Sequence, residues 1–179
     1  MISELIAKDE SNFGSIPRAV FISSIKDFVG ERPINQILEN TQILYRKYRL
    51  MEASIKSQQE SLVVKLPDIE SALETVRYRK KILVESTANQ TFYFPLADNI
   101  LVRGLAEPSD KIYLWLGANT VLEYNLDEAA DVLASNLAAA EKTVKFYQDS
   151  LDFIREQLTI LDVNTARIHN YGVTIQKSK

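Results

Sequence analysis

The sequence predicts a mainly helical α+β fold: a long antiparallel two-helix coiled coil with two β-hairpins between the helices. In two long stretches, apolar residues recur at alternating steps of four and three, the spacing of a helix that buries one narrow stripe against another helix. Between them lies a short block of alternating apolar residues and turn residues, which is typical of β-hairpins. Only five glycines and five prolines occur among 179 residues, which also favours long helices.

Residues 1–31 are expected to form a leader that is partly disordered, because its first dozen residues are polar. An apolar cluster follows from Ile16 to Ile22. Ser23 or Ser24 is a suitable cap for one short helical turn that ends near Gly30.

The first long helix is expected over residues 32–88, beginning near Pro33, since proline is favoured at the first helical position. Its register passes through Gln59 by a four-four step, a stutter that locally unwinds a supercoil. Pro67 lies inside the second part of the helix, where we expect a kink; a separate helix starting there is the alternative. The apolar stripe comprises Ile34, Ile37, Thr41, Leu44, Tyr48, Met51 and Ile55, then Leu62, Leu66, Ile69, Leu73, Val76, Lys80 and Leu83.

Residues 89–126 are expected to form four short strands joined into two consecutive hairpins. Turn residues occur at 97–99, 108–110 and 117–119, and Gly104 is a possible bulge within the second strand. Several strands are apolar on both faces, so two hairpins alone leave one face uncovered, and an open apolar edge would aggregate. We therefore expect other chains to cover this block. The expected assembly residues are Phe92, Phe94, Leu96, Leu101, Leu105, Ile112, Leu114, Trp115, Leu116, Val121, Leu122 and Tyr124.

The second long helix is expected over residues 127–172, followed by a tail at 173–179. Asn125 and Glu128 form a capping-box pattern at its start, and Gly172 is expected to end it. The two helices have matching lengths, as an antiparallel pair requires. The stripe runs Leu133, Leu137, Ala140, Val144, Tyr147, Leu151, Ile154, Leu158, Leu161, Thr165 and Ile168.

Composition excludes several classes of function. The net charge is −3, which gives no electrostatic case for binding nucleic acid. The absence of cysteine excludes disulfides and thiolate metal sites. The N-terminal residues lack the apolar region of a signal peptide, and no apolar run approaches the roughly 18 residues of a membrane span. We expect a cytoplasmic protein, with the nucleus as an alternative suggested by the basic residues at 77–81.

Catalytic, cofactor and metal sites are not indicated. His169 is the only histidine, and no nucleotide-binding or hydrolase motif accompanies it. Asp149, Asp152 and Glu156 are explained by a solvated helix face, and the basic run by a helix C-terminus. Apolar contact remains as the chemistry. At the helix ends far from the strands, apolar residues in and beside the stripe are expected to be open to water if no partner subunit covers them, and so to form an interaction site: Ile34, Ile37, Leu38, Leu161, Ile168 and Tyr171.

Several segments resemble the α-type subunits of eukaryotic prefoldins. The most specific is Leu114-Trp115-Leu116-Gly117-Ala118-Asn119-Thr120-Val121-Leu122-Glu123-Tyr124, followed by Asp127-Glu128-Ala129. Other matching segments lie at 16–22, 47–52, 66–69, 96–99, 151–157 and 163–167, so the resemblance covers residues 14 to about 173.

The resemblance implies a hexamer of two α-type and four β-type subunits, whose hairpins form a double β-barrel platform that carries six coiled-coil tentacles. Such complexes are ATP-independent chaperones that capture unfolded actin and tubulin at the coiled-coil tips and pass them to the cytosolic group II chaperonin. An alternative from another class is a static coiled-coil scaffold subunit in a cytoskeletal or transport complex.

Overall fold

The structure, a computed structural model, describes residues 4–7, 13–85 and 89–177. Along the chain, a short helix α1 (Ile25–Val29) comes first. Two long helices, α2 (Ile34–Glu85) and α3 (Leu126–Lys177), follow, with four strands between them in the sequence. The expected mainly helical α+β fold is therefore confirmed. The chain divides into two units: a leader unit of residues 1–62 and 143–179, and a hairpin unit of residues 63–142. Both long helices contribute to both units.

The two long helices are antiparallel. In the leader unit Ile34 lies against Gly172, and the side chains of Gln59 and Gln148 are hydrogen-bonded at 3.1 Å. In the hairpin unit Lys80 is paired with Asp127.

Helix α2 contains Pro67 without a break. The helix is continuous from Ile34 to Glu85, so the alternative of a separate helix beginning at Pro67 is wrong. An interior proline removes one backbone hydrogen bond. Pro67 is itself exposed, while the stripe residues Leu66 and Ile69 beside it are half-buried. The loss therefore falls on the solvent side of the helix.

The end expected for α3 at Gly172 is also wrong, because the helix continues to Lys177. Gly172 is buried within the helix, and a Cβ atom placed there would lie 3.2 Å from Cδ1 of Ile34. Glycine here permits close packing of the two helices. The expected start of α3 is correct: the Asn125 backbone N–H donates to the Glu128 carboxylate at 3.4 Å, as in a capping box.

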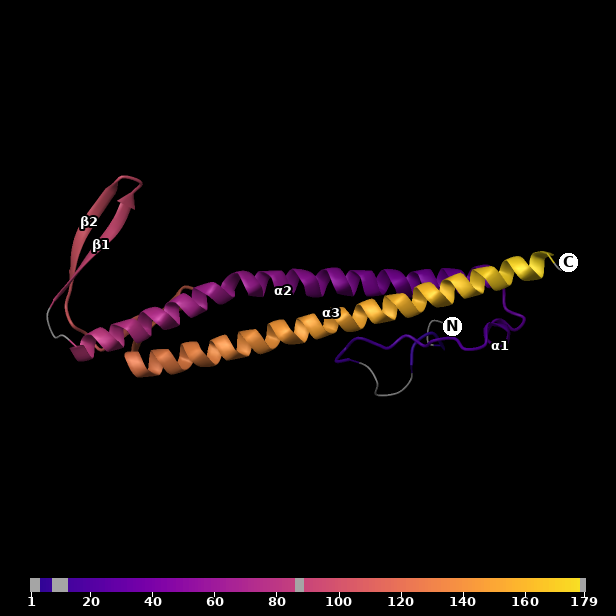
Figure 1. The fold of residues 1–179 in the computed structure, drawn as a ribbon, viewed down its shortest axis with the longest axis horizontal. Coiled ribbons are helices and arrows are strands. Elements are labelled where there is room, and N and C mark those ends of the chain that lie inside the picture. The colour runs from indigo at the N-terminus through magenta and orange to yellow at the C-terminus, as the bar shows by residue number, and fades with distance from the viewer. Residues whose placement is uncertain (1–3, 8–12, 86–88, 178–179) are drawn as a thin grey trace. The chain divides into compact units, whose positions relative to one another are not determined.

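The leader is packed against the long helices rather than loose in the residues that the structure describes (Figure 1). Helix α1 is capped by Ser24, whose hydroxyl accepts from the Asp27 N–H at 3.4 Å, and it ends at Gly30 with φ of 52°, as expected. Backbone hydrogen bonds join Ala7 to Arg18 and Val20 to Leu5, so the leader folds back on itself. Partial disorder is expected from the sequence for the first dozen residues. Of these, residues 1–3 and 8–12 lie outside the described part of the chain.

The core of the leader unit combines three segments. Leader residues and both helices contribute fully buried side chains, and the stripes expected from the heptad spacing supply most of the helical ones. This core comprises Leu5, Ile16, Ala19, Ile22, Val29, Ile37, Leu44, Tyr48, Ile154, Leu158, Leu161 and Ile168.

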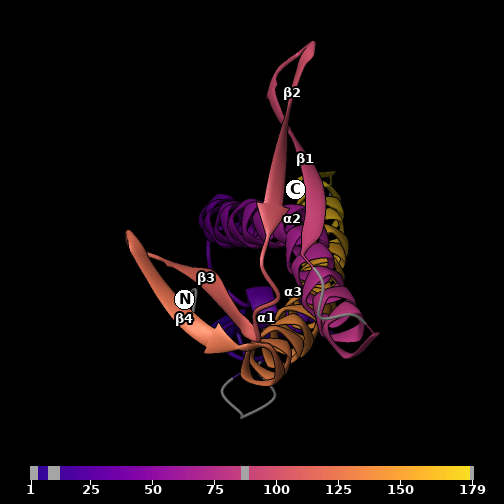
Figure 2. The same ribbon diagram turned by 90° about the vertical axis from the view of Figure 1, so that its left-hand side faces the viewer.

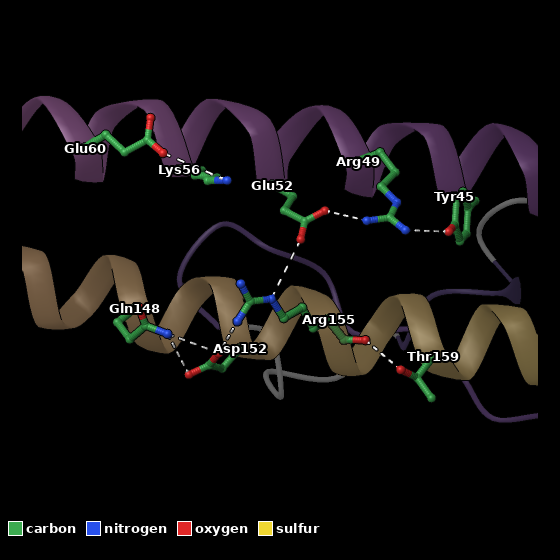
Figure 3. Close-up of polar contacts among 9 residues, drawn as sticks. All are labelled: Tyr45, Arg49, Glu52, Lys56, Glu60, Gln148, Asp152, Arg155 and Thr159. Carbon is green, nitrogen blue, oxygen red and sulfur yellow. Dashed lines mark hydrogen bonds and ion pairs between the residues drawn. The ribbon is translucent and has the colours of Figure 1, made fainter.

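Polar contacts beside this core also link α2 to α3 (Figure 3). Glu52 accepts from Arg49 at 2.8 Å on its own helix and lies 3.8 Å from Arg155 on α3. Arg155 donates in turn to Asp152 at 2.8 Å. Because Glu52 contacts a cation on each helix, it favours one axial register of the antiparallel pair.

The hairpin unit contains two separate two-stranded sheets (Figure 2). Strands β1 (Gln90–Ala97) and β2 (Ile100–Ala106) form one, and β3 (Lys111–Gly117) and β4 (Thr120–Asn125) form the other. The turn between β3 and β4 has positive φ angles, 47° at Ala118 and 60° at Asn119. This conformation matches the twist of a tight hairpin.

The bulge expected at Gly104 is absent, since Gly104 pairs regularly with Phe92. The register of this hairpin shifts between Pro95 and Ala97 instead. A Cβ atom at Gly104 would lie 2.8 Å from Cε2 of Phe94, so the glycine makes room for the phenylalanine ring. The sequence pattern identified an unusual glycine but assigned it the wrong cause.

Candidate functional site

Most of the expected assembly residues are exposed in the single chain. Trp115 has 68% of its surface accessible, and Leu96 has 73%. Phe94, Leu101, Leu105, Leu116, Val121 and Leu122 are also exposed, while Phe92, Ile112, Leu114 and Tyr124 are half-buried. Apolar surface of this extent on two hairpins is typical of a surface that another protein covers.

The hairpin of β3 and β4 has one covered face and one open face. Ile112, Leu114 and Tyr124 pack on a small core formed by Val76, Leu126 and Ala129 of the helices. Tyr113 and Trp115, which alternate with these residues along β3, point to the other side and are exposed. The helices thus cover the inner face of this hairpin, and its outer face has no cover among the described residues.

A charged cluster lies across the two strands. Glu123 accepts from the Lys111 ammonium at 2.5 Å and from the Tyr113 hydroxyl at 2.7 Å. The hydrogen bonds from Lys111 and Tyr113 lower the pKa of the Glu123 carboxyl, and the bond to Glu123 raises the pKa of both partners. The cluster therefore stays ionic at neutral pH and gives the outer face a polar border beside Trp115.

A groove lies beside the hairpin of β3 and β4. This open, mainly apolar groove of about 320 Å³ lies in the hairpin unit between strand β3 and the two long helices. Leu114 and Leu116 of β3 line it, together with Ile69 and Leu133 of the two helices. The groove borders the assembly residues, so it is part of the same surface.

Several side chains of the basic run at 77–81 make contacts within the hairpin unit. Lys80 pairs with Asp127, and this hydrogen bond raises the pKa of the lysine. The guanidinium of Arg79 lies 5.9 Å from the ring centre of Phe92, and Lys81 lies 3.9 Å from Glu85. Arg79, Lys80 and Lys81 of the run therefore have partners within the hairpin unit.

The residues expected to be open at the helix ends are covered. Ile37, Leu161 and Ile168 are fully buried, and Ile34, Leu38 and Tyr171 pack half-buried against the same core. The expectation that they are open to water is wrong for this chain by itself. The leader supplies the cover: Leu5 and Phe28 line a small cavity of about 10 Å³ together with Ile37.

Polar side chains on α3 hold the leader in place through its backbone. Gln157 accepts from the Ala19 N–H at 3.1 Å. Asn164 accepts from the Ile22 N–H at 3.1 Å and donates to the Val20 carbonyl at 2.8 Å. Both side chains are fully buried.

Two further side chains extend this contact. Arg167 donates to the carbonyl of Ile22 and, at 2.9 Å, to that of Ser23. From α2, the Tyr48 hydroxyl donates to the Pro17 carbonyl at 2.7 Å, and burial raises the pKa of this tyrosine to about 12. Tyr48 therefore keeps its proton, and its donor, throughout the physiological range.

The contacts that Gln157, Asn164, Arg167 and Tyr48 make with the backbone of the leader were not predicted from the sequence. One signal was available: Ser150, Gln157 and Asn164 recur at steps of seven on α3, beside the apolar stripe, and all three are buried. Polar residues in a heptad pattern one position before Leu151, Leu158 and Thr165 indicate a second contact face on the helix. A segment with backbone groups to satisfy is a natural occupant of such a face.

Metal-binding clusters and membrane-spanning helices are not found in the parts of the chain that the structure describes. Across residues 4–7, 13–85 and 89–177, no group of three histidine, aspartate or glutamate side chains is placed to hold a metal ion. His169 is exposed on α3. None of the described helices combines the length and the apolar character needed to cross a bilayer.

Comparison with known proteins matches these features to one family. The family model described as Prefoldin subunit matches residues 48–171. Prefoldin subunit 3 from Homo sapiens is 37% identical over 161 residues, which is 88% of this chain and 81% of the relative. The chain belongs to the prefoldin family. A probable prefoldin subunit 3 from Schizosaccharomyces pombe is 39% identical over 140 residues, 78% of this chain and 81% of the relative.

A solved prefoldin structure shares the fold. A chain of filamentous PFD from Methanocaldococcus jannaschii has a TM-score of 0.52 and 16% identity, and covers 66% of this chain and 94% of its own. At this identity the match concerns the fold alone. Membership of the prefoldin family brings with it a chaperone-type role and association with other prefoldin subunits.

Proposed function

We propose that this chain is the α-type subunit 3 of a hexameric, ATP-independent prefoldin that contains two α-type and four β-type subunits. The complex captures unfolded actin and tubulin at its coiled-coil tips and delivers them to the cytosolic group II chaperonin. It acts in the cytoplasm, with the nucleus as a further location. The observation that supports this most strongly is the similarity to proteins named prefoldin subunit 3, at 37% identity over 88% of the chain.

The exposed hairpins support the assembly part of the proposal. Trp115 and Tyr113 on the outer face of β3 are about two-thirds exposed in the single chain, at 68% and 67%. Aromatic residues with such exposure are enriched at protein interfaces. The hairpins therefore supply the platform contacts. In this proposal the client-binding chemistry belongs to the apolar side chains of the leader unit, which the leader covers in the single chain.

The capture of unfolded protein is tested by light scattering. Denatured actin is diluted into buffer with the reconstituted complex that contains either the full chain or a chain trimmed before Tyr48 and after Ile154. We expect the full complex to suppress aggregation and the trimmed one to assemble but lose suppression. Equal protection by the trimmed complex would refute capture at the tip.

One observation favours the alternative of a static scaffold subunit. The apolar residues at the helix ends are covered by the leader, so the single chain offers little open apolar surface there. A scaffold would keep this cover permanently and would ignore unfolded protein. The same scattering experiment separates the two functions, because a scaffold leaves the aggregation of actin unchanged.

A further inference from the structure

We propose that the face of α3 carrying Gln157, Asn164 and Arg167 is a binding site for extended polypeptide backbone, which the leader occupies until a client displaces it. The inference rests on the proposed function, because it assigns unfolded polypeptide as the ligand of this face. It also gives the leader a role, as an exchangeable occupant of the client site. The contacts that carry it all lie within the leader unit.

The first argument is that these side chains contact main-chain atoms of the leader. Gln157 and Asn164 accept from backbone N–H groups, and Asn164 also donates to a backbone carbonyl. Arg167 and Tyr48 donate to three further carbonyls. Every polypeptide carries these N–H and C=O groups at each residue other than proline, which lacks only the N–H.

The second argument concerns what the site requires of side chains. The leader buries Ile16, Ala19 and Ile22, three apolar residues spaced three apart, while Arg18 and Phe21 between them are exposed. An apolar residue at every third position is a weak requirement that many unfolded sequences meet. A folded protein is not bound by this face even where it meets that requirement, because its backbone groups are already paired within its own secondary structure.

The third argument is that the site is complete only when it is occupied. Gln157 and Asn164 are buried, and no buried side-chain nitrogen or oxygen in the described residues lacks a partner. Removal of the leader exposes these amides together with the core that includes Leu161 and Ile168. Polar groups that select a backbone would then lie beside apolar groups that bind side chains, which is the composition of a peptide-binding groove.

The leader is a strong competitor because it is part of the same chain. Its effective concentration at the site is high, so a short peptide added in solution displaces it poorly. A large unfolded client that binds several subunits at once has the same advantage and can displace it. The leader therefore selects for clients that are long and unfolded.

The test uses the full-length chain in the reconstituted complex and a labelled peptide with the sequence of residues 15–24. Ala19→Glu places a charge at a buried leader position and should expel the leader without changing α2 or α3. Ser15→Glu makes the same charge change at an exposed leader position and is the matched control. The readout is fluorescence anisotropy of the peptide, with circular dichroism to verify that the helices remain intact.

We expect the peptide to bind the A19E complex about tenfold or more tightly than the wild-type and S15E complexes. A second peptide, N-methylated at the positions of Ala19 and Ile22, keeps every side chain but lacks the donors to Gln157 and Asn164, and it should not bind. Equal binding of the two peptides, or of A19E and wild type, would overturn the proposal.

A cross-link provides a second test that leaves the groove residues intact. The rings of Phe13 and Phe146 stack with their centres 5.5 Å apart, and the chain has no cysteine. F13C/F146C, joined by a short cleavable thiol linker, should hold the leader in place and abolish suppression of actin aggregation until the linker is cleaved. Full suppression in the cross-linked state would contradict displacement of the leader.

The two proposals fail differently. If the wild-type complex suppresses aggregation but A19E gains no peptide binding, the chaperone function stands and the backbone-binding groove is refuted. If A19E binds the peptide through its N–H groups while no complex suppresses aggregation, the groove stands and the proposed function is refuted.

Discussion

Gly172 of α3 lies directly against Ile34 of α2, so that a Cβ atom at the glycine would meet the isoleucine at 3.2 and 3.3 Å. The contact lies where α2 begins, and Ile34 is only half-buried, so its side chain has room to shift. Glycine in a helix interior costs about 1 kcal/mol relative to alanine. These two effects oppose each other when the glycine is replaced by alanine.

Replacement of Gly172 should therefore depend on size. We expect G172A to leave the free energy of unfolding within about 1 kcal/mol of wild type, because the helical gain offsets the crowding. G172V should lower it by about 1–3 kcal/mol, the usual cost of overpacking. Urea unfolding measures both, and I34A should partly restore the stability of G172V. A G172V protein as stable as G172A would show that the helices do not approach closely here.

Asn164 should be the most sensitive polar residue of the leader contact. In N164A the Ile22 N–H and the Val20 carbonyl lose their partner, and each unsatisfied buried group costs about 1–3 kcal/mol. We expect faster amide hydrogen exchange at residues 19–22 and faster tryptic cleavage after Arg18. N170A, at an exposed position six residues further along the helix, is the control. Unchanged exchange at Ile22 in N164A would contradict the contact.

Tyr48 should make stability fall at high pH. Its pKa is about 12 in the folded chain and 10.0 for the free side chain, because burial disfavours the phenolate. Below pH 10 both states keep the proton and the contribution is complete. Between pH 10 and 12 the unfolded state alone loses the proton, which lowers the free energy of unfolding by about 3 kcal/mol.

Y48F separates this effect from the hydrogen bond to Pro17. At pH 8 it should be less stable than wild type by about 1 kcal/mol, the net value of one hydrogen bond. Its stability should then fall less steeply than that of wild type as pH rises, so the two curves cross before pH 12. Urea unfolding between pH 8 and 12 measures this, with Y78F, at an exposed tyrosine, as control. Parallel curves for Y48F and wild type would show that the loss of stability at high pH does not come from Tyr48.

The sequence predicted those features that depend on local periodicity. Every residue of the α3 stripe is buried or half-buried, because residues at alternating steps of four and three lie on one side of a helix and face the same neighbouring helix. Turn residues at 97–99 and 117–119 located both hairpins. These features are set by neighbours in sequence.

The features that the sequence did not predict depend on contacts between distant residues. The leader has no heptad pattern, and its place is fixed by Gln157 and Asn164, about 140 residues away. Gly172 and Gly104 looked like a helix end and a bulge, because glycine commonly serves those purposes. In both cases the reason is instead a bulky side chain, Ile34 or Phe94, that packs against the glycine.

The last prediction concerns Trp115, the only tryptophan of the chain. It is exposed in the single chain, and the proposed assembly covers it with other subunits. Chain labelled with 5-fluorotryptophan should therefore show a changed ¹⁹F resonance and weaker quenching by iodide when the unlabelled partner subunits are added. A large aromatic residue at the centre of an interface contributes about 2 kcal/mol or more to association.

Replacement of Trp115 by alanine should weaken assembly accordingly, by roughly thirtyfold at 1.4 kcal/mol per factor of ten. The control is V64A, which removes an exposed apolar side chain from α2 in the same unit. Circular dichroism should show both variants folded, since Trp115 is not part of the small core under the hairpin. If W115A assembles as well as V64A and iodide quenching is the same with and without partners, the outer face of β3 lies outside the platform, and the exposed residues of β1 and β2 must then supply the interface.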